Sequence, residues 1–155
     1  MAIIEVATGR KLTVSISPLE ETDFKRITKK RYFLDWKKEK GTADLFKLTL
    51  LRESEILGLL ALKDFPREFR MQIHLLCVSR ENLGKGKKYD DIAGSLIAFA
   101  ARTAISKYFD QACISLLPKT ELRGHYKTKY GMMDGGPQLF LEGASLHAII
   151  KKYLP

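Results

Sequence analysis

The segment NLGKGKKYDDIAGSLIAFA, residues 82–100, passes directly from a polar loop into an apolar run. Residues 82–91 contain three lysines and two glycines, a composition typical of a turn-rich loop. Residues 92–109 mix small side chains with large aliphatic ones, so a helix formed there is apolar around much of its circumference. We therefore expect a long helix that begins close to Ile92 and lies flat against a sheet.

The flanking segments show strand-like and helix-like patterns in turn. Apolar alternation or short apolar runs predict strands at residues 11–17, 45–51, 56–62, 71–78, 112–117 and 138–141. Helical spacing predicts helices at residues 19–30, between the cap Thr120 and Gly131, and at residues 146–154. This order predicts an α/β fold with a mixed central sheet flanked by helices, in which residues 71–78 and 112–117 run parallel around a cleft.

Length and composition restrict the class of protein. A chain of 155 residues, 45% hydrophobic and 29% charged, is expected to form a single globular domain over residues 1–155. The uncharged run at residues 92–101 is far shorter than the roughly 20 apolar residues that span a bilayer, so we expect no membrane segment. Residues 1–12 lack the features of a secretory signal, and the two cysteines, Cys77 and Cys113, form no CxxC pair. A cytoplasmic protein with reduced thiols is expected.

The charge balance points to anionic partners. The 27 basic and 18 acidic side chains give a net charge of +9, which attracts polyanions such as nucleic acids and phosphorylated cofactors. The basic residues cluster at residues 25–40, 80–88 and 123–129. No His, Cys, Asp and Glu spacing predicts a metal site.

The loop before the apolar helix is a candidate phosphate site. Free N–H groups at a helix start and the helix dipole together bind anions, and glycine lets the backbone come close to a phosphate. The residues expected to contribute are Lys85, Lys87, Lys88, Ala93, Gly94 and Ser95. Neither the P-loop pattern nor the GxGxxG pattern is present, and an ordinary solvated loop is the alternative.

The element order, this loop and the downstream segment HYKTKYGM, residues 125–132, resemble the GNAT superfamily of acyl-CoA-dependent N-acetyltransferases. In that resemblance, residues 71–78 correspond to the family's fourth strand, and residues 125–132 to its tyrosine-containing helix. The family's Q/R-x-x-G-x-G/A pattern is altered, since Tyr89 and Ile92 stand at its first two defined positions. Tyr126 lies five residues before Gly131, where the family usually has four.

The resemblance implies direct transfer of an acetyl group from acetyl-CoA to a primary amine, with the cofactor arm between the parallel strands. Backbone N–H groups at Cys77 and Val78 are the expected oxyanion donors, and Tyr126 is the candidate acid for the departing thiolate. Its neighbour His125 is an alternative acid. His74, expected to share a face with Gln72 and Leu76, is a candidate base, Glu81 is another, and a water chain is a third.

Two other functions remain open on the sequence alone. The segment KKRYFLDWKKEK, residues 29–40, places Tyr32, Phe33 and Trp36 among basic residues, as in proteins that stack single-stranded nucleic acid. Aromatics that face the core would give the same pattern. A basic nucleic-acid-binding module and a non-catalytic acyl-CoA-binding protein are therefore the alternatives. The amine acceptor, whether a small molecule, a protein or aminoacyl-tRNA, is not specified, and the resemblance also allows a homodimer.

Overall fold

A computed structural model describes residues 1–155 and contains one sheet of nine strands. The strands are β1 (Ala2–Glu5), β2 (Lys11–Pro18), β3 (Asp44–Leu50), β4 (Ile56–Phe65), β5 (Arg70–Val78), β6 (Tyr89–Asp90), β7 (Cys113–Leu116), β8 (Met133–Gly135) and β9 (Gln138–Glu142). Their order across the sheet is β6-β1-β2-β3-β4-β5-β7-β9-β8. Only β5 and β7 pair in parallel, so the mixed α/β sheet predicted from the sequence is confirmed.

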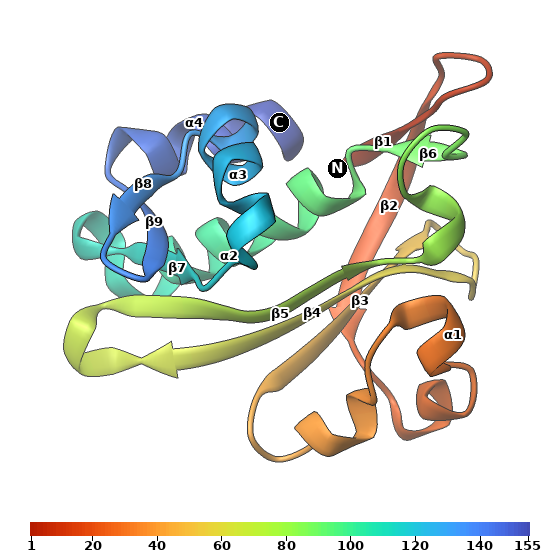
Figure 1. Ribbon diagram of the computed structural model, residues 1–155, viewed down its shortest axis with the longest axis horizontal. Coiled ribbons are helices and arrows are strands. Elements are labelled where there is room, and N and C mark those ends of the chain that lie inside the picture. Colours follow the sequence, from red (N-terminus) through yellow and green to blue (C-terminus); the bar gives the residue numbers. More distant parts are fainter.

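Helices cover both faces of this sheet (Figure 1). They are α1 (Lys29–Tyr32), α2 (Ile92–Tyr108), α3 (Arg123–Tyr130) and α4 (Ala144–Tyr153). Figure 1 shows α2, α3 and α4 on one side of the sheet and α1 on the other, together with the chain that forms the 3-10 turns Glu21–Lys25 and Trp36–Glu39. A cluster of 27 buried residues lies below α2, where four alanines of the helix are fully buried. A smaller cluster of seven residues packs against α1 and includes Tyr32 and Trp36.

The parallel strands part within the sheet. Arg70–Ile73 of β5 pairs with Cys113–Leu116 of β7, but β5 continues for five residues beyond that pairing. The register against β4 also shifts there, because Leu75 faces Ala61 and Ile73 faces Leu62, which leaves His74 as the extra residue of a β-bulge. Residues 74–78 of β5 therefore border an open edge, as expected for strands that diverge around a cleft.

Several local predictions were wrong. The strands β1, β6 and β8 have only two to four residues, too few to show an alternating pattern. The helix predicted at residues 19–30 is replaced by the 3-10 turn Glu21–Lys25 and by the one-turn α1. Thr120 does not cap α3, because the 3-10 turn Thr120–Leu122 comes first and α3 starts at Arg123. Gly131 ends α3 as predicted, with φ of 71°.

A buried carboxylate holds the first 3-10 turn against the sheet. Asp23 is 1% exposed and accepts hydrogen bonds from Lys47 of β3 at 2.8 Å, from Arg26 at 2.8 Å and from the Glu20 N–H at 2.7 Å. Burial alone raises the pKa of Asp23, but these three donors outweigh it and leave the pKa below its ordinary value. The α1 side of the sheet is thus fixed by a charge network.

Candidate functional site

The first turn of α2 has unused backbone donors. Asp91 precedes the helix with φ of 73°, and its carbonyl accepts both the N–H of Ser95 at 3.0 Å and the Ser95 hydroxyl at 2.7 Å. The N–H groups of Ile92, Ala93 and Gly94 lie ahead of that first helical bond and have no carbonyl one turn earlier in the helix. The helix dipole adds positive potential at the same point, so the turn is suited to an anion.

The glycine-lysine loop folds back onto this helix start. The buried side chain of Asn82 accepts the Tyr89 N–H at 3.0 Å and donates to Ser79 at 2.9 Å, which ties the two ends of the loop together. Between loop, helix start and α3 lies a cavity of about 450 Å³. Its lining includes Val78, Lys85, Lys87, Ala93, His125, Lys129 and Tyr130. A cavity therefore forms where the sequence predicted a phosphate site.

The three predicted loop lysines differ in position. Lys85 is exposed and lines the cavity. Lys87 also lines it, but its ammonium pairs with Asp90 at 3.0 Å. Lys88 does not line the cavity, and its ammonium lies 5.3 Å from the centre of the Tyr89 ring. Lys129 of α3 lines the cavity as well and was not assigned from the sequence, because its helix is remote in the chain.

Acidic side chains at the cavity oppose part of this positive charge. Asp90 and Asp91 both contribute to the lining. Burial, and then the neighbouring Asp90 carboxylate, raise the pKa of Asp91 above its ordinary value. The cavity thus combines lysine ammonium groups with the Asp91 carboxylate, whose ionised form is disfavoured by its surroundings.

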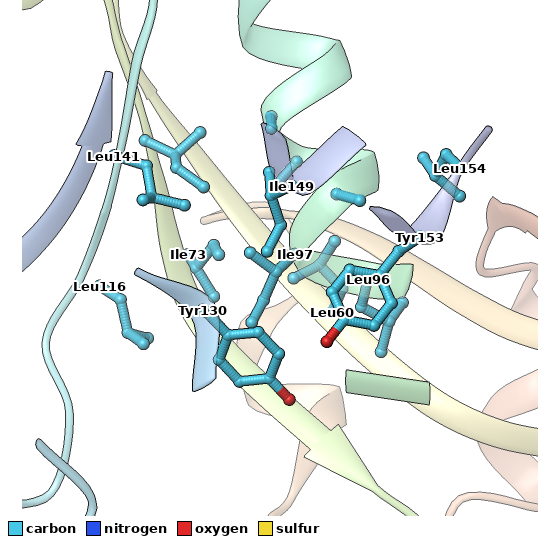
Figure 2. Packing of buried hydrophobic residues seen from close by; sticks show 14 of the residues in the cluster. Leu60, Ile73, Leu96, Ile97, Leu116, Tyr130, Leu141, Ile149, Tyr153 and Leu154 are labelled. Carbon is cyan, nitrogen blue, oxygen red and sulfur yellow. The ribbon is translucent and has the colours of Figure 1, made fainter. Parts of the chain in front are cut away.

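Gly94 is required by packing on α4, which corrects the expectation that it lets a phosphate approach. A Cβ built on Gly94 would lie 2.4 Å from the ring of Tyr153, and Tyr153 is 4% exposed. Figure 2 shows Tyr153 beside Tyr130, and their ring centres are 6.1 Å apart. Ser95 is fully buried, so of the three predicted helix residues only Ala93 lines the cavity.

The open edge of β5 continues from the cavity. The Ser79 N–H donates to the Leu57 carbonyl of β4 at 2.9 Å, and donors alternate in direction along an antiparallel strand. The Cys77 N–H therefore faces β4, whereas the N–H groups of Leu76 and Val78 face the open edge. Cys77 was wrongly predicted as a donor, and its thiol lies on the α1 side, 3.2 Å from the Tyr32 carbonyl.

Three aromatic rings of α3 gather beside the cavity. The Tyr126 ring lies 5.9 Å from the rings of both His125 and Tyr130. Burial raises the pKa of Tyr126, so its phenol stays protonated at neutral pH and remains able to donate. Tyr126 packs against the main core, whereas His125 and Tyr130 line the cavity. Tyr130 was not singled out from the sequence.

Comparison with solved structures identifies the fold. A mutant form of the spermidine/spermine N-acetyltransferase SpeG from Vibrio cholerae matches with a TM-score of 0.64 over 88% of this chain and 97% of that chain, at 14% identity. The chain has the fold of the GNAT acetyltransferases. No protein-family model matches it, and no curated protein matches it in sequence.

Two further matches with the GNAT fold contain coenzyme A. An acetyltransferase from Bacillus subtilis in complex with CoA has a TM-score of 0.57 over 85% of this chain and 99% of that chain, at 12% identity. N-acetylglutamate synthase from Neisseria gonorrhoeae, complexed with coenzyme A and L-arginine, has a TM-score of 0.61 at 14% identity. That match covers 88% of this chain and 34% of that chain. At these identities the likeness establishes the fold.

The two candidate bases lie on the α1 side of the GNAT sheet. His74 is 30% exposed, and its Nε2 lies 3.1 Å from an Oε atom of Glu39, in the 3-10 turn Trp36–Glu39. The bulge turns His74 away from Leu76, which packs on the α2 side, so the prediction that the two share a face was wrong. The Arg31 guanidinium donates to Glu81 and lowers its pKa, which makes Glu81 a poor proton acceptor.

The basic aromatic segment largely faces the core. Tyr32 and Trp36 are each 1% exposed, and the Tyr32 hydroxyl donates to the Ile56 carbonyl at 2.8 Å. Phe33 alone is exposed, with the Arg80 guanidinium 4.6 Å from its ring centre. The segment therefore offers one aromatic face to solvent instead of a stacking platform.

No three His, Cys, Asp or Glu side chains lie close enough together to hold a metal ion. None of the helices has both the length and the hydropathy needed to cross a membrane.

Proposed function

We propose that this protein is an N-acetyltransferase that transfers an acetyl group from acetyl-CoA to a primary amine. One observation carries the proposal: the cavity at the start of α2 is continuous with the open edge of β5, because Val78 belongs to both. The cavity fits a pyrophosphate, and the open edge fits an extended arm that uses strand hydrogen bonds. A linear phosphorylated thioester needs this pair of subsites.

The lengths agree with this placement. Val78, at the cavity, is four residue steps along β5 from His74, which lies at the point where β5 and β7 diverge. At about 3.3 Å per strand residue, the open edge is about 13 Å long. An extended pantetheine arm along it would bring the thioester to the divergence point, where both faces of the sheet can be reached.

The residues have distinct roles in the proposed transfer. Bound acetyl-CoA supplies an activated carbonyl carbon. The outward N–H groups of Leu76 and Val78 donate to the carbonyl oxygens of the arm and of the thioester, where negative charge develops during attack. Ala93 and its helix turn hold the pyrophosphate. Tyr126, whose phenol is protonated at neutral pH, or its neighbour His125 gives a proton to the departing sulfur.

The acceptor remains to be identified by assay. The neighbours of this fold include enzymes named for spermidine, spermine and nourseothricin, and an N-acetylglutamate synthase. Polyamines, nourseothricin, amino acids, peptides and aminoacyl-tRNA therefore form the first panel of acceptors. Release of free CoA thiol, measured with a thiol reagent, reports transfer to any of them.

Thermal stability separates this proposal from a nucleic-acid-binding module. A ligand at one hundred times its dissociation constant stabilises the folded state by about 2.7 kcal/mol. We expect the melting temperature to rise with CoA and acetyl-CoA, and CoA thiol to appear with at least one amine. A rise with RNA and none with CoA would reject the proposal. CoA binding without release of thiol would indicate a non-catalytic acyl-CoA-binding protein instead.

A further inference from the structure

We propose that Glu39 and His74 form the base that deprotonates the acceptor amine, with Glu39 as the residue that positions the imidazole. The proposal rests on the N-acetyltransferase function proposed above. His74 is the extra residue of the bulge and lies immediately after the last paired residue of β5, Ile73. It therefore stands where the open edge begins.

The contact with Glu39 defines which ring nitrogen is available. An ionised carboxylate only accepts hydrogen bonds, so the Nε2 that lies 3.1 Å from it carries the proton in the neutral ring. The lone pair is then on Nδ1, which has no hydrogen-bond partner in the protein. Nδ1 is also not sealed from solvent, since the one buried unpartnered side-chain atom is Oε1 of Gln138. The free nitrogen is thus open to an incoming amine.

His74 lies on the face of the sheet opposite α2, because it follows Ile73, which is buried on the α2 side. The cofactor cavity lies on the α2 side, while Glu39 reaches the histidine from the α1 side. An amine that approaches from the α1 side meets Nδ1 of His74, while acetyl-CoA enters from the α2 side. The two substrates would then be bound at the same time on different faces of the sheet, so the acetyl group can pass directly from one to the other.

An unpartnered oxygen lies on the same face. Leu139 of β9 faces Leu116 of β7, which faces Ile73 of β5, so Gln138 is level with His74 across the three strands. Leu139 is buried in the cluster below α2, and alternation turns Gln138 to the other face. Gln138 thus lies on the His74 side of the sheet, beyond the point where β5 and β7 part, and its Oε1 is closed to solvent. It adds no charge beside the imidazole.

The remaining charges near this face do not replace Glu39. Lys63 of β4 is opposite Gln72 in the register, and Arg70 of β5 is bound to Glu68 and to the Ser115 hydroxyl. Glu39 is the carboxylate in contact with His74, and the two side chains are 22% and 30% exposed. The negative charge beside the ring therefore comes from Glu39.

The proton balance of the step is complete. His74 takes one proton from the ammonium of the acceptor through Nδ1, which frees the nitrogen lone pair for attack. The C–N bond forms and the C–S bond breaks. The second nitrogen proton is lost as the amide forms, and the sulfur takes up one proton to give the CoA thiol. One proton per turnover is released to solvent, by way of His74.

The test compares two variants with two matched controls. His74→Gln removes the base, and Glu39→Gln keeps an acceptor for Nε2–H but removes the charge. His147→Gln, on the exposed outer side of α4, and Glu21→Gln, on the neighbouring 3-10 turn, change the same residue types elsewhere. The assay measures acetyl transfer from acetyl-CoA to the best amine of the panel as a function of pH. If no amine exceeds water, it measures acetyl-CoA hydrolysis, which needs the same base.

We expect His74→Gln to lower kcat about 100-fold, a typical contribution of a general base. Glu39→Gln should lower kcat about tenfold with little change in the KM for the amine, because the ring that has taken up the amine proton loses its counter-charge, and Glu39→Asp should restore most of the kcat. A merely structural role for Glu39 would change KM together with kcat. The CoA dissociation constant should change less than twofold in both variants, which shows that the cofactor site is folded. Both controls should match the parent.

Two results would overturn the proposal, and they are distinguishable. An active parent whose His74→Gln and Glu39→Gln variants keep full kcat at every pH would reject the base pair and leave the acetyltransferase function intact. A parent that neither binds CoA nor turns over acetyl-CoA with any amine or with water would reject the function, and the base pair with it.

Discussion

Two lysines that line the cavity, Lys85 of the loop and Lys129 of α3, should account for most of the electrostatic attraction for CoA. Both are exposed, so each interacts with a phosphate charge through water, at about 1 kcal/mol for a separation of about 4 Å. Changing both to alanine should therefore cost between about 1.4 and 2 kcal/mol. The CoA dissociation constant should rise roughly 10- to 30-fold.

Calorimetric titration of CoA at low and high salt is the appropriate assay. At 1 M salt the screening length falls to about 3 Å from about 10 Å at 0.1 M, so the difference between parent and variant should nearly vanish. The matched control is the double change Lys37→Ala and Lys88→Ala, which removes the same charge from positions that do not line the cavity. Equal weakening by both double variants would refute the cavity as the phosphate site, because the attraction would then depend on net charge alone.

Gly94→Ala should destabilise the fold by about 2 kcal/mol in denaturant titrations, because its Cβ would meet the Tyr153 ring at 2.4 Å, and by less than about 1 kcal/mol in a Tyr153→Ala background. Equal losses in both backgrounds would contradict the clash. Tyr126→Phe should lower kcat at least tenfold in the CoA-release assay and leave the CoA dissociation constant unchanged; unchanged kcat would assign the proton to His125 or to water. The free energy of unfolding should fall as the pH drops below about 4, because the lowered pKa of Asp23 means that the unfolded chain binds its proton first. Urea titrations from pH 5 to pH 2 should show a weaker fall for Asp23→Asn, and identical slopes would contradict the role of Lys47 and its partner.

Long apolar elements could be predicted from the sequence, and short paired ones could not. The helix at residues 92–109 matches α2 to within one residue, because its alanines and aliphatics have no other stable arrangement than burial against a sheet. The edge strands β6 and β8 form because a neighbour supplies the hydrogen bonds, and two or three residues carry no pattern of their own. The helix predicted at residues 19–30 does not form, because tertiary contacts of Asp23 override a weak helical spacing.

The candidate site could be predicted only where its residues are adjacent in the sequence. The phosphate loop could be located because glycine, lysine and a helix start are adjacent in sequence. Lys129, Tyr130 and Glu39 could not, because each reaches the site from a distant segment of the chain. The prediction that His74 shares a face with Leu76 failed because of a bulge, since a one-residue shift in register reverses every later face of β5. A sequence pattern of period two cannot reveal that shift.

The central claim is that CoA binds with its pyrophosphate at the first turn of α2 and its arm along the open edge of β5. A crystal structure of the protein with CoA tests this directly. The account predicts phosphate oxygens within about 3.2 Å of the backbone nitrogen of Ala93, and pantetheine oxygens within the same distance of the backbone nitrogens of Leu76 or Val78. CoA bound outside the cavity, with those three N–H groups still facing water, would contradict it.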